Sequence, residues 1–356
     1  MNGAPNSAPI ARRRFSAAEL TGVIFRLREL GIFVALLVCI VIFSVRAGNF
    51  LTVGNWQDIG TDVAMVAVVA VGETMVVLTR NIDLSVGSIV GVSSFVAANT
   101  LQHHHHASLL LVAILAALVG CACGLGNGLL VAYGKIPAII ATLATLAIYR
   151  GIDFELTNGE NVLAANLPQN FLNFSSETPL GVPVLAWLAV AVALAGAAIL
   201  RWAPWARDFY AIGSNPEAAR ATGIPVARRL IAAFMLSGAL AGVGGFMFAA
   251  RFGGVDATSG TSFEFMVVTA VVIGGVNVFG GSGSVLGAML GALLVATIDN
   301  GFTLLRFSEF WKIFFEGAAI VVAVTVDALL NKRLQELLRR RRRPELTTLV
   351  ELEAKA

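Results

Sequence analysis

Apolar runs recur along the chain at lengths that fit membrane-spanning helices. One span needs about 20 mostly apolar residues. Ten such runs follow one another, separated by short polar or glycine-rich stretches, and the third and fifth are short. Their approximate limits are 29–47, 58–79, 84–101, 107–133, 136–152, 182–200, 228–250, 263–280, 284–304 and 311–330. The pattern predicts an all-α, polytopic membrane protein with about ten transmembrane helices.

The composition excludes a water-soluble enzyme. Hydrophobic residues make up 57% of the chain and charged residues only 13%, whereas soluble domains carry about 25% charged residues. The three cysteines, Cys39, Cys121 and Cys123, all lie inside apolar runs. They form neither a disulfide framework nor a metal motif. The adjacent histidines His103 to His106 also lack the spacing of a defined metal site, so we predict no metal centre.

The placement of positive charge predicts the orientation. Lysine and arginine gather on the cytoplasmic side of membrane proteins. If ten spans alternate from a cytoplasmic N-terminus, 20 of the 25 basic residues fall inside and 5 outside. We therefore expect both termini on the cytoplasmic side of the membrane. The expected parts are an N-terminal cytoplasmic segment 1–28, a transmembrane domain 29–331 and a basic cytoplasmic tail 332–356.

The basic tail is expected to contact the membrane. Its run Arg339 to Arg343 lies shortly after the last span, where it suits anionic lipid headgroups or anchors the end of that span. Nucleic acid is a poor partner for a segment at the membrane surface.

Two connections between spans are long. The outside stretch 153–183 is polar and rich in asparagine, and its length predicts a cap or lid. The inside stretch 201–229 contains a short predicted helix. Either Ser214 and Glu217 form a capping box, or Asn215 caps the helix and the next proline takes its first position. Gly223 suits the left-handed residue that closes a helix.

A helix this short needs something to pack against. Local physics allows either a connector on the membrane surface or a docking site for a cytoplasmic partner. The segment resembles the coupling loop of ABC importer permeases, and the matching residues are Ser214, Asn215, Glu217, Ala218, Ala219 and Gly223. In that family the helix sits in a groove of a separate ATP-binding subunit.

The resemblance extends over most of the chain. The blocks 72–88, 126–143, 213–216 and 274–291 are similar, in this order, to the sugar permeases of the ribose/xylose branch. Arg80 departs from that pattern, because many relatives have a small residue such as glycine there. The segments Arg80–Asp83 and Phe307–Trp311 look closest to rhamnose and autoinducer-2 permeases.

Polar residues inside the apolar runs, or at the link between the second and third runs, are candidates for the solute path, since such residues are costly at bilayer depth. The candidates are Glu73, Asn81, Asp83, Asn127, Asp299 and Asn300. Each also has a structural interpretation. Asp83 fits a helix N-cap, with Asn81 completing the same turn, and Glu73 fits a bond to a neighbouring hydroxyl or backbone group. Hydrogen bonds between helices suit Asn127, Asp299 and Asn300. The residues alone do not decide between the two roles.

The chain lacks a phosphate-binding loop of the form G-x-x-x-x-G-K-[ST]. We therefore expect a transport subunit rather than an enzyme, with no cofactor of its own, while ATP and Mg²⁺ bind a partner ATPase. The resemblance implies three partners: this ATP-binding subunit, a periplasmic sugar-binding protein, and a second copy or a related permease. The alternative is an ion-coupled secondary transporter that uses Glu73 or Asp299. The sequence does not identify the sugar.

Overall fold

The computed structural model describes residues 17–308, 310–322, 324–325 and 328–329, with side chains from residue 30 onward. The described part is helical and forms no strand, only one isolated β-bridge between Val162 and Val255. This confirms the all-α fold class. The helices are α1 (Ala17–Arg46), α2 (Val53–Leu78), α3 (Val86–His103), α4 (Leu109–Ala132), α5 (Ala138–Thr157), α6 (Gln169–Ser176), α7 (Val184–Trp202), α8 (Pro204–Ser214), α9 (Pro216–Ala221), α10 (Val226–Phe252), α11 (Phe263–Ile273) and α12 (Val285–Leu304). Residues 310–322 are also helical.

Each of the ten predicted runs overlaps one of these helices. Five helices of the described part are long and apolar enough to cross a membrane: α2, α4, α7, α10 and α12. Leu30–Arg46 and Phe263–Ile273 are shorter apolar segments. The count of ten spans and the location of both termini stay predictions. Residues 1–16 of the N-terminal segment and the whole tail 332–356 lie outside the described residues.

Helix boundaries differ from the predicted limits by five residues or more at four places, one of which is the start of α2 at Val53 instead of residue 58. α1 begins at Ala17, well before residue 29, and α5 continues to Thr157. The predicted run 263–280 is wrong in its second half, because α11 ends at Ile273. The reason is local: Gly275 takes a φ of +83°, which ends a helix, and a loop of glycines leads from there to α12.

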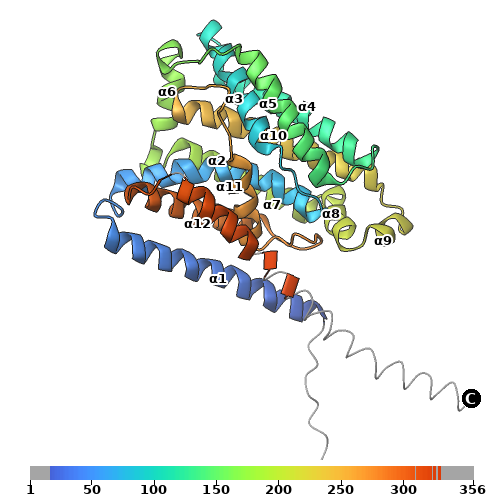
Figure 1. Ribbon diagram of the computed structural model, residues 1–356. Helices are drawn as coiled ribbons and strands as arrows, with labels where there is room; N and C mark the ends of the chain where they lie inside the picture. Colours follow the sequence, from blue (N-terminus) through green and yellow to red (C-terminus); the bar gives the residue numbers. More distant parts are fainter. Residues whose placement is uncertain (1–16, 309, 323, 326–327, 330–356) are drawn as a thin grey trace, which may run out of the picture.

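Helix α10 lies at the centre of the domain, against α2, α3 and α4 (Figure 1). Its closest neighbour is α4, and glycines line both sides of that contact. A Cβ added at Gly120 would overlap the carbonyl oxygen of Gly238, and one at Gly238 would overlap that of Gly120. Gly124 and Gly242 make similar backbone contacts one turn away. Small residues four apart on both helices thus let the two backbones touch.

The two long connections lie at opposite ends of the helices (Figure 1). The stretch 153–183 contains α6, whose buried Phe171 packs edge-on against Phe246 of α10 with ring centroids 5.4 Å apart. α6 therefore caps one end of the domain. Helices α8 and α9, from the stretch 201–229, occupy the other end. This opposition is what the predicted alternation of outside and inside connections requires.

Helix α1 lies at the edge of the domain, beside α12 (Figure 1). Ile32, Leu36 and Phe43 face the domain and are buried. The opposite face of α1 is apolar and exposed, with side chains such as Leu37 and Val41. In a membrane protein such a face contacts lipid.

Candidate functional site

Three of the predicted path residues meet in one buried polar network at the link between α2 and α3. One carboxylate oxygen of Asp83 accepts the backbone N–H of Ser85 at 2.9 Å and the Ser85 hydroxyl at 2.7 Å. The amide nitrogen of Asn127, on α4, donates to both Asp83 oxygens at 3.3 Å and to Ser85 Oγ at 2.7 Å. The Tyr149 hydroxyl, on α5, donates to Asn127 Oδ1 at 3.3 Å. The network thus ties the start of α3 to α4 and α5.

Glu73 connects the same network to α2. Its Oε1 accepts the backbone N–H of Asp83 at 3.0 Å. Its other oxygen is buried and has no hydrogen-bond partner among the described residues. Asn81 lies beside the network, and its amide donates to the carbonyl and hydroxyl oxygens of Thr79 at 3.1 and 2.9 Å. Buried polar groups that bond to one another in this way fix a unique arrangement of helices.

This geometry favours the structural interpretation of the three residues. Glu73, Asp83 and Asn127 are all fully buried within the chain, so no solute reaches them in this conformation. The expected N-cap role of Asp83 is wrong: Ser85 is the N-cap of α3. Asp83 instead closes the turn before the helix, because its carboxylate accepts an N–H two residues ahead. A role in the solute path stays a prediction.

Asp299 and Asn300 do not join this network. Asp299 forms an ion pair with Lys312 at 3.1 Å, and the Asn300 amide donates to Asn55 Oδ1 at 3.0 Å. Both interactions connect α12 to neighbouring helices. The sequence grouped six polar residues, and the structure separates these two from the other four.

Sequence reasoning missed Tyr149. A phenol inside an apolar run was the available signal, because a buried tyrosine hydroxyl needs a hydrogen-bond partner. Besides Asn127, this hydroxyl reaches the Cys123 carbonyl oxygen, at 2.8 Å.

Replacing Asn127 with leucine should destabilise the protein by about 1–3 kcal/mol, because Asp83, Ser85 and Tyr149 lose a buried partner. Thermal unfolding of the purified protein in detergent measures the effect as a fall in Tm. Thr297→Val is the matched control, since the hydroxyl of this buried residue bonds only to its own helix, at Leu293. Equal Tm values for the two variants would contradict the role given to the network.

The predicted short helix is α9, and Asn215 caps it. The Asn215 side-chain oxygen accepts the backbone N–H groups of Glu217 and Ala218, each at 3.0 Å. Pro216 occupies the first helical position. Gly223 has a φ of +84° just after the helix, as expected. The capping-box alternative is wrong, because Ser214 is the last residue of α8.

Helix α9 is held against its neighbours on one face only. Ala219 is buried and packs with Ile212 of α8 and Val226 of α10. An ion pair of 2.7 Å between Arg229 Nε and Asp208 Oδ2 also joins α10 to α8. Glu217 and Ala218 point to the exposed side. The helix therefore presents Glu217 outward from a fixed support.

Sequence reasoning missed α8, which provides this support. The signal was Pro204, which takes the first position of α8 and has the fixed φ that starts a helix well.

A junction of three segments lies behind α8. The N–H of Gly281 donates to the carbonyl oxygen of Leu78, the last residue of α2, at 3.0 Å. Gly213 of α8 lies against both groups of this hydrogen bond, and a Cβ at Gly213 would overlap the Leu78 oxygen. Arg80 follows Leu78 closely and has a φ of +68°, with a Cβ at Gly280 falling 2.8 Å from its own. The departure from glycine at residue 80 therefore occupies a left-handed position that glycine favours. We call Leu78, Arg80, Gly213, Gly280 and Gly281 the α8 junction.

Comparison with known families bears on all of these elements. Residues 56–324 match the family described as branched-chain amino acid transport system / permease component. The chain belongs to this permease family. The match runs from the beginning of α2 into the helical residues 310–322, so it includes the buried network, the α8 junction and α9.

Individual relatives match over most of their length. The autoinducer 2 import system permease protein LsrC of Klebsiella pneumoniae is 38% identical over 307 residues, which cover 86% of this chain and 88% of that protein. LsrC of Escherichia coli K12 is 35% identical over 315 residues, or 88% and 91% of the two chains. LsrC of Salmonella paratyphi B is 36% identical over 308 residues, or 86% and 88%. No solved structure matches the chain.

These relatives confirm the predicted family. The resemblance to permeases of the ribose/xylose branch, found first in four short blocks, holds over most of the chain. The chain is a permease component of an ABC importer, a multi-pass protein of the inner membrane, and a transport subunit without its own ATP site.

Proposed function

We propose that this permease carries a small sugar-like solute of the autoinducer-2 type into the cell, driven by a separate ATPase that docks on α9. The observation that carries the coupling is the geometry of α9: a capped helix on a fixed support, with Glu217 outward at the end of the domain opposite α6. The acidic residue lies in the first turn, where the helix dipole favours it.

Coupling needs a physical connection from α9 to the transmembrane helices. α9 follows α8 directly, and α8 contacts the end of α2 through the α8 junction. The link from α2 to α3 carries Asp83, which bonds to Ser85 at the start of α3 and to Asn127 of α4, and Asn127 in turn bonds to Tyr149 of α5. When the ATPase modules close on ATP and Mg²⁺, a displacement of α9 reaches these helices through this chain of contacts. The solute path then opens alternately to the two sides.

The solute and the other partners follow from the relatives. LsrC is named for autoinducer 2 import, and the matched branch carries sugars, so a small polyhydroxylated solute is proposed. A periplasmic binding protein would deliver it and supply most of the specificity. A second copy of this chain or a related permease would complete the path. Within one copy Glu73, Asp83 and Asn127 are fully buried and line no open path.

Ion-coupled transport by this chain alone finds no support in the described part. Glu73 is buried against the Asp83 backbone, and Asp299 is paired with Lys312. Glu73 is fully buried and reaches no open path, and the charge of Asp299 is already balanced by Lys312.

Glu217→Arg should leave the protein in the membrane and reduce uptake at least about tenfold, because a reversed charge at a docking contact costs more than about 1.4 kcal/mol. Uptake of labelled autoinducer 2 and labelled ribose into vesicles with the ATPase and binding protein measures this, and co-purification reports docking. Glu177→Arg is the matched control, since Glu177 is exposed beside α6 at the opposite end. Normal uptake by Glu217→Arg would refute the docking site. Uptake of neither solute by the unaltered complex would refute the solute class.

A further inference from the structure

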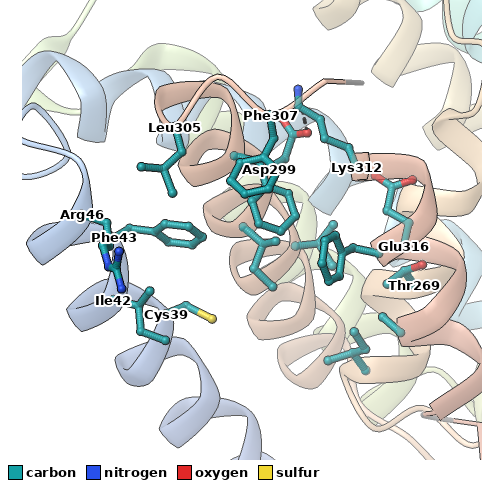
Figure 2. A pocket seen from close by; sticks show the side chains of 16 residues that line it. Cys39, Ile42, Phe43, Arg46, Thr269, Asp299, Leu305, Phe307, Lys312 and Glu316 are labelled. Atoms are coloured by element: carbon teal, nitrogen blue, oxygen red, sulfur yellow. Dashed lines mark ion pairs between the residues drawn. The ribbon is translucent and has the colours of Figure 1, made fainter. Parts of the chain in front are cut away.

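A cavity of about 710 Å³ lies between α1, α11, α12 and the helical residues 310–322 (Figure 2). Most of its lining is aliphatic or aromatic. Phe43 meets Phe302 edge-on with ring centroids 6.1 Å apart, and Phe302 stacks beside Phe315 at 5.0 Å. The side chains of Cys39 and Ala319 line it from the two opposite walls, α1 and residues 310–322. None of these groups belongs to the buried network or to the α8 junction.

This lining does not fit the proposed solute. A polyhydroxylated molecule placed against phenylalanine and isoleucine side chains would leave most of its hydroxyls without hydrogen bonds, at a high cost for each. Water is also a poor occupant, since a space of this size would hold roughly twenty molecules and most of the lining offers them no hydrogen bond. A molecule that is mostly hydrocarbon therefore fits this lining best.

The cavity borders the bilayer. One of its walls is α1, the helix at the edge of the domain, and the outward face of α1 is apolar and exposed. Phe315, on another wall, is 42% exposed. Lipid chains therefore lie next to the opening, and hydrocarbon needs no transfer through water to enter it.

The lining also includes polar side chains, which a hydrocarbon chain alone would leave without a hydrogen-bond partner. Arg46, in the last turn of α1, is exposed, and no hydrogen bond or ion pair of its side chain occurs among the described residues. Thr269 is buried in the wall, and its hydroxyl has no partner in the described part of the chain. Asp299 and Lys312 neutralise each other at 3.1 Å (Figure 2). Among the described lining groups, Arg46 and the Thr269 hydroxyl are thus left without a partner, and the lining also includes the Glu316 carboxylate, from residues 310–322 (Figure 2).

We propose that this cavity is a specific phospholipid site, with an acyl chain between α1 and residues 310–322 and the phosphate paired with Arg46. Arginine recognises phosphate through two parallel N–H groups, and the Thr269 hydroxyl is a donor for an ester carbonyl. The recognised chemistry is a phosphodiester joined to an acyl chain. Phosphatidylglycerol and phosphatidylethanolamine both supply it.

Photolabelling of the full-length protein in lipid nanodiscs tests the site. The probes are phosphatidylglycerol and phosphatidylethanolamine with a photoreactive group on one acyl chain, and mass spectrometry locates the adducts. We expect several-fold more label on residues 39–46 and 295–302 than on 110–118 of α4, which has an exposed apolar face. Ala319→Trp and Cys39→Trp fill the cavity from opposite walls and should each remove most of that excess. Leu118→Trp, at an exposed position of α4, is the matched control and should leave it unchanged.

Substitutions of Arg46 test the proposed contact with the lipid headgroup. Arg46→Glu should reduce cavity labelling several-fold, and Arg46→Lys should reduce it less, because lysine keeps the positive charge but not the two parallel N–H groups. An equal loss with both probes assigns recognition to the phosphodiester, and a larger loss with phosphatidylglycerol assigns it to net negative charge. Equal labelling of the cavity and of α4 would overturn the proposal, as would full labelling in a tryptophan variant that elutes as a folded protein. Adducts joining two copies of the chain at these residues would also overturn it, since a protein would then fill the space.

Discussion

Gly238→Leu will prevent the permease domain from folding stably. A leucine side chain at this position must enter the space now filled by the α4 backbone, because even a Cβ overlaps the Gly120 carbonyl oxygen. Overpacking a rigid core costs about 1–3 kcal/mol when side chains adjust. Here a helix backbone must move, so we expect a loss above this range. Helix α10 would separate from α4, and the centre of the domain would open.

The measurement is the amount of monodisperse protein in size-exclusion chromatography of a fluorescent fusion, together with its Tm. Gly151→Leu is the matched control, since a Cβ at Gly151, on α5, meets no atom within 4 Å. It should elute as the unaltered protein does. A Gly238→Leu variant with unchanged yield and Tm would show that α4 and α10 do not pack as closely as described.

Gly213→Ala will separate ATP hydrolysis from transport. The added methyl group overlaps the Leu78 oxygen and comes close to the N–H of Gly281, so the α8 junction must open. Helix α9 keeps its cap and its exposed face, since Asn215 and Glu217 are unchanged. We therefore expect the ATPase to dock and hydrolyse ATP at the basal rate, while uptake falls at least about tenfold, the effect of a free-energy change near 1.4 kcal/mol.

The two assays distinguish this variant from Glu217→Arg, which should lose the ATPase itself. Gly54→Ala is the control, because a Cβ at Gly54, near the beginning of α2, meets no atom within 4 Å. Uptake at the unaltered rate by Gly213→Ala would remove the α8 junction from the coupling pathway. Loss of the bound ATPase would show that α8 and α9 cannot be perturbed separately.

The apolar runs predicted the helices because a bilayer demands about 20 apolar residues for each crossing. Helix ends were harder to predict. The end of α11 at Ile273 depends on Gly275 and the loop behind it, and a hydropathy pattern does not report backbone torsions. The capping of α9 was predictable down to two alternatives, since Ser214 and Asn215 both have suitable side chains. The existence of α8 decided between them, because it takes Ser214 as its own last residue.

The candidate site was predicted as residues but not as an arrangement. Glu73, Asp83 and Asn127 were identified by their polarity, yet Asn127 lies 44 positions from Asp83. Their meeting depends on how far α4 is shifted along α10, and backbone contacts at Gly120 and Gly124 set that shift. Asp299 and Asn300 have the same polarity and a different location, because α12 packs near α1 and α2 instead. Side-chain chemistry alone did not contain this information.

The position of α1 has a consequence for biogenesis. α1 leaves the ribosome before the other described helices, and its main neighbour, α12, begins at Val285, which follows Arg46 by 239 residues. During most of translation α1 must therefore remain in the bilayer without its partner. An apolar helix is stable in the bilayer during this interval, because lipid tails solvate it as well as leucine side chains do. α1 thus enters the membrane long before α12, and the contact between the two helices forms late in synthesis.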